Sequence, residues 1–314
     1  MRLFKKYLIT LLIFIILNNN LYISAFANNK DLRSNYKSIS IDLNRDGIND
    51  TIFITLNEDN TYNIQATINK NNIPLFPEKK IKIIGHYRDY WPLSVTMKDL
   101  NRDNIPEILI QASYSDRAVQ HIFQYINGIF VNISTEEKNI LGFMDTTNNQ
   151  SPKLLIGNFY NGEIFFKNYM VNSNGLSEFT NNPKEDFMGK FTISNLISYI
   201  ESLPYSDYSI CNNFFSNILS EERVKLLDSL RWNDFRYKFQ DAFFYDISSD
   251  NNGSIREVKW KLNFKGTSDS GESKNFTLTL VLSNLNNLNS ENTSSYEYKI
   301  TYLGIDNVNN TFVN

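Results

Sequence analysis

The chain has 314 residues, of which 41% are hydrophobic and 21% are charged, and its formal net charge is −3. This length allows two domains of ordinary size, and this composition indicates a packed globular protein rather than a disordered one. A mildly acidic chain is a poor candidate for sequence-independent nucleic-acid binding, which depends on Lys and Arg at phosphates. We therefore expect no nucleic acid among its partners.

Residues 1–27 have the three-part pattern of a secretory signal peptide. A basic region at 2–6 precedes an apolar run at 7–17, and Ala25 and Ala27 fit a cleavage site after Ala27. The apolar run is too short for an ordinary membrane span, and an uncleaved anchor is the alternative. We expect a secreted or cell-surface protein with no membrane span after signal cleavage.

The region from residue 36 to about residue 180 has the pattern of short β-strands separated by Asn, Gly, Asp and Pro, after a loose polar lead-in at 28–40. Several runs alternate with a period of two or are rich in β-branched and aromatic residues. Asn127-Gly128 is typical of a two-residue hairpin turn, because both positions tolerate positive φ. The expected strands are 51–56, 62–68, 80–84, 93–97, 108–112, 121–126, 130–133, 153–156 and 164–171.

The pattern changes after a predicted linker near residues 181–186. Helical spacing predicts three helices, with Ser194 as the candidate N-cap of the first, and a period of two then predicts an antiparallel meander. Helices followed by strands indicate an α+β domain over residues 190–314. The expected helices are 193–203, 209–219 and a third from 220, and the expected strands are 255–264, 275–283 and 296–303.

Two stretches, 42–50 and 99–107, share one pattern of oxygen-bearing side chains, and each is followed by an aliphatic strand. Ca²⁺ takes six to eight oxygen ligands, and a loop with oxygens at positions 1, 3, 5, 7 and 9 wraps the ion in one turn. A strand follows each loop, whereas an EF-hand continues as a helix. The predicted ligands are the side chains of Asp42, Asn44, Asp46 and Asp50 with the Ile48 carbonyl, and those of Asp99, Asn101, Asp103 and Glu107 with the Ile105 carbonyl.

The alternative interpretation of both loops is a solvated, Asx-rich hairpin that binds nothing, because Asp, Asn and Gly are ordinary turn formers. A third, degraded copy begins at Asp145 and has Lys153 where the others have Asp50 and Glu107. An ammonium group repels a cation. We therefore expect the third loop to keep the fold and to bind no metal.

Residues 42–55 and 99–112 resemble FG-GAP/VCBS repeats, the blade motifs of integrin α-type propellers and of many secreted bacterial proteins. The resemblance covers about residues 36–180, and it implies a calcium-binding all-β repeat domain of about three blade-like units. That number is too small for a closed ring, and the Phe-Gly and Gly-Ala-Pro signatures are missing. We therefore expect an incomplete or irregular propeller-like domain, which an oligomer could complete, followed by the α+β domain.

The sequence contains no recognisable catalytic constellation. Its two histidines, His86 and His121, lack the spacing of a zinc site or a nucleophile elbow, and Cys211 has no protease signature around it. The aromatic stretch 87–91 is a candidate glycan or protein contact, although core packing of Tyr90 and Trp91 is favoured.

These observations favour a secreted or cell-surface, calcium-binding, non-enzymatic module that contacts an extracellular protein or glycan. The alternative is an extracellular hydrolase with its site in or next to the C-terminal α+β domain. A third hypothesis is a structural component of the cell envelope.

Overall fold

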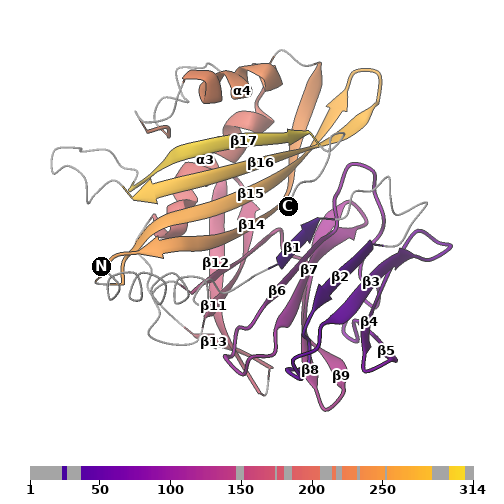
Figure 1. Cartoon of the computed structure of the whole chain (residues 1–314). Helices are drawn as coiled ribbons and strands as arrows, with labels where there is room; N and C mark the ends of the chain where they lie inside the picture. Colours follow the sequence, from indigo (N-terminus) through magenta and orange to yellow (C-terminus); the bar gives the residue numbers. More distant parts are fainter. Residues whose placement is uncertain are drawn as a thin grey trace, which may run out of the picture.

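The computed structural model describes residues 23–26, 37–145, 152–173, 175–179, 186–205, 214–216, 221–231, 234–251, 253–284 and 297–307. This part of the chain is mostly β, with three sheets and few helices, and none of the three sheets closes into a barrel (Figure 1). Among these residues, no helix is long and apolar enough to cross a membrane.

The first sheet is a four-stranded antiparallel meander. Its strands follow the chain: β2 (Lys37–Ile41), β3 (Asp50–Leu56), β4 (Tyr62–Ile68) and β5 (Asn71–Pro74). Strand β4 alternates between buried and half-buried residues, so one face belongs to the core. The expected loose lead-in is wrong for residues 37–40, because Ile39 in β2 is buried and the strand pairs with β3.

The second sheet has five strands in the order β1 (Ile23–Phe26), β6 (Ser94–Lys98), β7 (Glu107–Tyr114), β8 (Arg117–Ile126) and β9 (Ile129–Glu136). Its inner face packs on the first sheet, and Met97, Ile110 and Phe123 share a core with Ile52 and Ile64. Strand β1 pairs with β6 and lies within the predicted signal peptide.

Two local expectations for this region have different outcomes. The Asn127-Gly128 turn is confirmed, since φ is 51° at Asn127 and 87° at Gly128 between paired strands. The strand expected at 80–84 is wrong. Ile81 and Ile84 are buried in a segment without a strand, so hydrophobic side chains here fill the core without strand pairing.

The third sheet has eight strands and joins both halves of the sequence. Strand β10 pairs in parallel with β14, so the predicted linker near 181–186 does not separate two sheets. Strand β14, which was not among the expected strands, is therefore central. In sheet order the strands are β13 (Gly175–Phe179), β12 (Glu163–Asn172), β11 (Lys153–Tyr160), β10 (Ile140–Met144), β14 (Phe235–Ser249), β15 (Ile255–Ser268), β16 (Ser273–Asn284) and β17 (Tyr298–Asn307).

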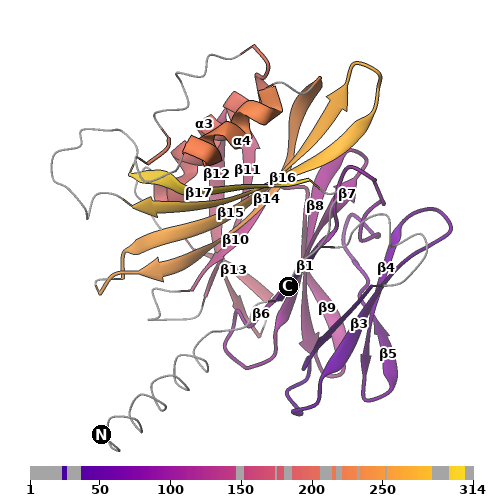
Figure 2. The same ribbon diagram turned by 45° about the horizontal axis from the view of Figure 1, so that its top comes forward.

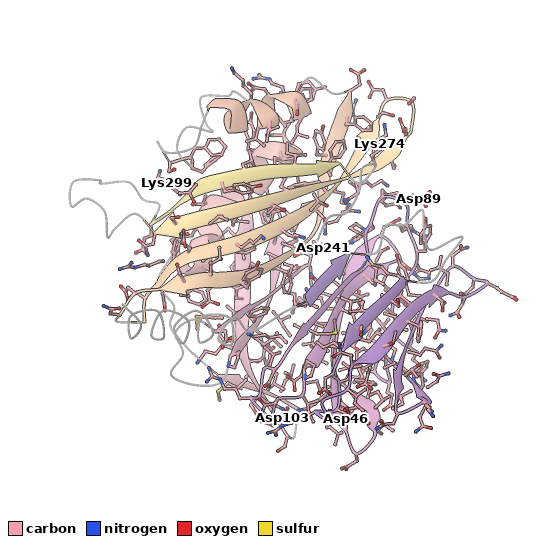
Figure 3. The ribbon with its side chains drawn as sticks, viewed as in Figure 1. Asp46, Asp89, Asp103, Asp241, Lys274 and Lys299 are labelled. Atoms are coloured by element: carbon pink, nitrogen blue, oxygen red, sulfur yellow. The ribbon has the colours of Figure 1, made fainter. Side chains whose placement is uncertain are left out.

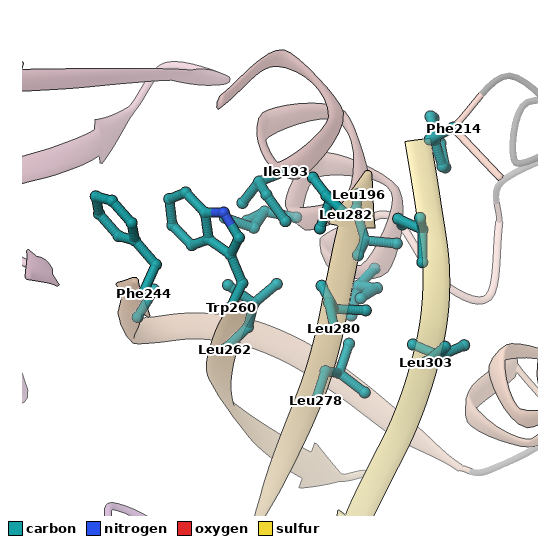
Figure 4. Packing of buried hydrophobic residues seen from close by; sticks show 14 of the residues in the cluster. Ile193, Leu196, Phe214, Phe244, Trp260, Leu262, Leu278, Leu280, Leu282 and Leu303 are labelled. Carbon is teal, nitrogen blue, oxygen red and sulfur yellow. The ribbon is translucent and has the colours of Figure 1, made fainter. Parts of the chain in front are cut away.

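Helices α3 (Lys190–Glu201) and α4 (Glu221–Arg231) lie on one side of this sheet (Figure 2). The largest core lies between them and the strands, where Trp260, Leu262 and Leu280 point toward Ile193 and Leu196 of α3 (Figure 4). The indole N–H of Trp260 donates to the carbonyl of Met188, just before α3, at 3.0 Å.

Two helix expectations are corrected. Helix α3 begins at Lys190 after a left-handed Gly189, so Ser194 is a buried residue within the helix and not its N-cap. The helix expected at 209–219 is wrong where residues 214–216 are described, because Phe215 forms a parallel bridge with Ile300 of β17. The rest of that range lies outside the described residues.

Candidate metal-binding loops

The two predicted calcium loops occupy equivalent places in their sheets. Residues 42–49 join β2 to β3, where Ile41 pairs with Asp50, and residues 99–106 join β6 to β7, where Lys98 pairs with Glu107. Asp46 and Asp103 lie at the same end of the N-terminal sheets (Figure 3). The fold thus places the two loops beside one another.

In the first loop, the carboxylate of Asp42 organises the turn. Its Oδ1 accepts the Arg45 backbone N–H at 2.7 Å, and its Oδ2 accepts the Gly47 N–H at 2.9 Å. Asp46 Oδ1 accepts the Ile48 N–H at 2.8 Å. These bonds hold the chain in one tight turn, in which glycine supplies the positive φ of 83° at position 6 without a Cβ penalty.

The second loop repeats this geometry. Asp99 Oδ1 accepts the Arg102 N–H at 2.6 Å, and Asp99 Oδ2 accepts the Asn104 N–H at 2.9 Å. Asp103 Oδ1 accepts the Ile105 N–H at 2.7 Å. Asn104 has a positive φ of 68°, a conformation that asparagine tolerates better than most non-glycine residues.

The last acidic residue of each loop is buried at the start of a strand. Asp50 Oδ2 accepts the Leu43 N–H at 2.9 Å, and Glu107 Oε2 accepts the Leu100 N–H at 2.7 Å. Burial, together with the smaller effect of the Asp103 and Asp99 charges, raises the pKa of Glu107 to about 8, although the hydrogen bond from the Leu100 N–H lowers it. Burial also raises the pKa of Asp50. A cation beside either carboxylate would favour its ionised form.

The structure therefore gathers the eight predicted ligand side chains into two matched loops, but it does not close a metal cage. Within the described residues, no group of three or more His, Cys, Asp or Glu side chains is placed to hold a metal ion. The carboxylate oxygens accept backbone N–H groups instead. Ile48 exposes 66% of its surface, so its side chain does not bury the first loop. Calcium binding stays a prediction.

The start of the third loop has a different environment. Asp145 Oδ2 lies 2.6 Å from the Lys98 ammonium, and its Oδ1 lies 3.5 Å from Arg102 Nη2. Lys153 pairs with Met144, so the hairpin has the same register as the two complete loops. Residues 146–151 lie outside the described part. Asp145 is held by cationic side chains of the protein itself.

The aromatic stretch 87–91 lies where the N-terminal sheets meet the eight-stranded sheet. Trp91 is buried, and its indole N–H donates to Asp241 Oδ2 on β14. Asp241 also accepts the Asn263 amide at 2.7 Å, and burial raises its pKa to about 6. Lys265 Nζ lies 4.0 Å from the centre of the Tyr90 ring.

Sequence reasoning missed Asp241, because the central strand that carries it was not expected. The available signal was a single acid within a strongly aromatic run, Phe239-Gln240-Asp241-Ala242-Phe243. A buried carboxylate in such a run needs polar partners, and Trp91 and Asn263 provide them. These two hydrogen bonds connect the segment at 87–91 and strand β15 to the central strand β14.

The histidines lie in the N-terminal sheets. His121 is buried, with its Nε2 3.0 Å from the Ile84 carbonyl oxygen and its Nδ1 3.0 Å from the Thr135 hydroxyl oxygen. Burial lowers its pKa to about 4. The His86 ring stacks on Tyr114. Cys211 lies outside the described residues.

No protein-family model matches the chain, and no curated protein matches it. Among solved structures, it is similar to a subtype N11 neuraminidase-like protein of A/flat-faced bat/Peru/033/2010 (H18N11), with 10% sequence identity and a TM-score of 0.23. The match covers 74% of this chain, and the chain spans 56% of that protein. A likeness this distant carries no argument about function.

Proposed function

We propose that the protein is a secreted or cell-surface, calcium-binding, non-enzymatic module that binds an extracellular protein or glycan. The main support is the pair of matched hairpin loops, in which corresponding oxygens accept corresponding backbone N–H groups at nearly equal distances. The signal-peptide pattern at residues 1–27 supports export.

Calcium would act on the loops by replacing weak internal contacts with ionic ones. In the first loop Asp42, Asn44, Asp46 and Asp50 supply side-chain oxygens, and the Ile48 carbonyl supplies one more. Because burial raises the pKa of Glu107, a cation that binds the second loop through this carboxylate would have to displace a proton, so calcium affinity of this loop should increase with pH. Binding would stiffen the end of the sheets where both loops lie.

The finer architecture that we propose is an irregular, propeller-like arrangement rather than a closed ring. The three hairpins share one register, in which the residue before each loop pairs with the loop's ninth residue. The third hairpin, however, belongs to the eight-stranded sheet. In this proposal the repeated hairpins do not form separate blades, because the third one is part of the eight-stranded sheet.

The proposal is tested by calcium titration of the secreted form, using calorimetry and thermal melting with and without EGTA. We expect calcium to raise the melting temperature through mass action. Asp46→Ala should remove the part of this rise that comes from the first loop, and Asp103→Ala the part that comes from the second. Asp250→Ala is the matched control, because Asp250 caps a hairpin turn outside both loops and accepts the Ser254 N–H at 2.8 Å. If the titration shows no heat of calcium binding and EGTA does not change the melting temperature, the proposal of calcium binding is wrong.

A further inference from the structure

Strand β8 turns alternate residues toward the two sheets that lie on either side of it. Val119 and Phe123 belong to the core that the five-stranded sheet shares with the first sheet. Ile122 points the other way and shares a core with Phe243 of β14. Residues two positions apart in a strand lie on one face, so Gln120 has the orientation of Ile122. The Gln120 side chain therefore points into the junction between the five-stranded and eight-stranded sheets.

Strand β14 turns two consecutive residues toward the same junction. Phe239 and Ala242 both belong to the core on the helix side, although they are three positions apart. The register with β15 shifts between Phe239 and Asp241, so Gln240 is the extra residue of a β-bulge. Gln240 and Asp241 therefore share the opposite face. The hydrogen bond from Trp91 to Asp241 agrees with this orientation, and Asp241 lies where the sheets meet (Figure 3).

Gln111 connects the two strands. It stands directly opposite Gln120 in the register of β7 and β8, and its Nε2 donates to the Ala242 carbonyl of β14 at 3.0 Å. Gln240 lies two positions before Ala242 on that strand, and β8 and β14 also contact each other directly. The junction thus holds three glutamine side chains, Gln111, Gln120 and Gln240, which we call the glutamine layer.

Two members of the glutamine layer are buried without polar partners. Gln120 and Gln240 expose 1% and 4% of their surfaces, and neither Oε1 nor Nε2 of either side chain has a hydrogen-bond partner among the described residues. The Ser113 hydroxyl, on the same face of β7 as Gln111, is also buried without a partner there. A buried amide without a hydrogen bond has lost its hydration without compensation, so folded proteins pair such groups with protein or with ordered water.

Small side chains leave room beside the glutamine layer. Ser94 of β6 stands next to the layer, and Ser113 stands opposite Ala118 in the following row. In the row on the other side of the layer, Leu109 stands opposite Ile122, and both pack in an apolar core. The site is therefore polar, bounded by small residues, and closed at one end by apolar side chains, as a buried water site requires.

We infer that the glutamine layer binds one or more ordered water molecules that bridge β8 to β14. Water donates and accepts hydrogen bonds, so one molecule can serve the amide oxygen of one glutamine and the amide nitrogen of the other. A larger ligand would have to separate the sheets, because all four amide atoms of Gln120 and Gln240 are buried. The water site goes beyond the proposed function and does not depend on calcium.

Crystallography at a resolution that shows ordered water, together with NMR in solution, tests the site on the full chain. We expect water at about 2.7–3.2 Å from amide atoms of both Gln120 and Gln240. In solution, the side-chain amide protons of Gln120 should show nuclear and rotating-frame Overhauser effects of opposite sign with water, the signature of a long-lived internal molecule. A direct hydrogen bond between the two glutamines, with no water at either amide, would overturn the inference.

Substitution by methionine, which has a similar length and no amide, shows whether the two glutamines share water. Gln120→Met and Gln240→Met should each lower the midpoint of urea unfolding, because each leaves the water with fewer partners. The double variant should lose less than the sum of the two single losses, since no glutamine is then left to hydrate.

The variants are also compared by NMR once circular dichroism shows that they are folded. In Gln120→Met the Overhauser effect between water and the Gln240 amide should weaken. Gln65→Met, at a half-buried glutamine of β4 in the first sheet, is the matched control and should leave the water effects at Gln120 and Gln240 unchanged. Additive losses in urea unfolding would show that Gln120 and Gln240 do not share water and would overturn the bridge between β8 and β14.

Discussion

Arg45 Nη1 donates a hydrogen bond to the backbone carbonyl of Asp103 at 3.2 Å, so a side chain of the first predicted calcium loop contacts the second loop. Arg102, at the equivalent position of the second loop, has its Nη2 3.5 Å from Asp145 at the start of the third. Both arginines have a positive φ of 63°. The fourth residue of each loop thus connects one repeat to the next.

Removing the first of these connections should loosen the loops slightly. Arg45→Ala loses an exposed, charge-assisted hydrogen bond, so we expect the free energy of unfolding to fall by at most about 1 kcal/mol. Amide hydrogen exchange should increase in residues 99–106 as well as near residue 45. Urea unfolding and hydrogen exchange measure these effects. Exposed Arg256, on β15, gives the control Arg256→Ala, and unchanged exchange at 99–106 would contradict the connection.

The ion pair between Lys98 and Asp145 should matter more, because both side chains are largely buried. The two charged atoms are 2.6 Å apart, with side-chain exposures of 6% and 14%. Lys98→Met leaves the carboxylate with exposed Arg102 as its remaining ion-pair partner, so we expect a loss of about 3 kcal/mol in urea unfolding.

A double variant distinguishes two contributions to stability: the free-energy cost of a buried carboxylate that has lost Lys98, and the net stabilisation by the ion pair. Lys98→Met combined with Asp145→Asn removes both charges, and we expect it to recover much of the stability that Lys98→Met loses. The Asp145 backbone N–H donates to Asp246 Oδ1 at 2.9 Å, and neither substitution removes this donor or its acceptor. If the double variant is no more stable than Lys98→Met, the buried carboxylate does not cause the loss of stability in Lys98→Met.

The elements that sequence reasoning predicted well are those whose pattern is local. Strand β4 has the expected bounds of 62–68, and the Asn127-Gly128 turn depends on two adjacent residues. Strand β14 was not predicted, because it is buried on both faces along much of its length and its polar residues therefore do not alternate with apolar ones. Its partners come from distant parts of the chain, and a local pattern carries no information about them.

The candidate sites also differ in whether they are formed by neighbouring residues or by distant parts of the chain. Each predicted calcium loop is a local sequence, and the hydrogen bonds around Asp42 and Asp99 join residues at most five positions apart. By contrast, Trp91 meets Asp241 across 150 positions, and Phe215 meets Ile300 only where β17 has its place in the eight-stranded sheet. Such juxtapositions follow from sheet pairing, which the sequence pattern left undetermined.

His121 should make the protein sensitive to mild acid. Its pKa is about 4 in the folded state against 6.5 for an ordinary histidine, so the unfolded chain binds more protons between these values. Stability from the neutral imidazole is therefore present above pH 6.5 and is lost as the pH falls toward 4. The expected loss between pH 7 and pH 4 is on the order of 3 kcal/mol.

The measurement compares the wild type with His121→Gln in urea unfolding from pH 4 to pH 7. Asp186 and Asp241, each with a pKa raised to about 6, titrate in the same range with the opposite slope. Both proteins share those groups, so the difference between the two curves isolates His121. His121→Gln should be the less stable at pH 7, with the gap narrowing toward pH 4. Parallel curves would show that His121 does not titrate in this way.

The parallel junction between β10 and β14 depends on Gly142. A Cβ atom there would lie 2.5 Å from ring atoms of Phe244 and 2.6 Å from the Phe244 carbonyl oxygen, so the two strands would have to shift. Phe244 has little freedom to move, because its ring stacks on Trp260 with centres 4.2 Å apart. We expect Gly142→Ala to lower the free energy of unfolding by about 1–3 kcal/mol through overpacking.

A double-mutant cycle with Phe244→Leu shows whether this contact is the cause. Phe244→Leu alone should also destabilise the protein, because it removes the stack on Trp260. If the Gly142 Cβ clashes with the ring, the double variant loses less stability than the sum of the two single losses, since the smaller side chain makes room. The clash with the backbone carbonyl remains, so recovery is partial. Additive losses in urea unfolding would show that the ring does not set the packing limit at Gly142.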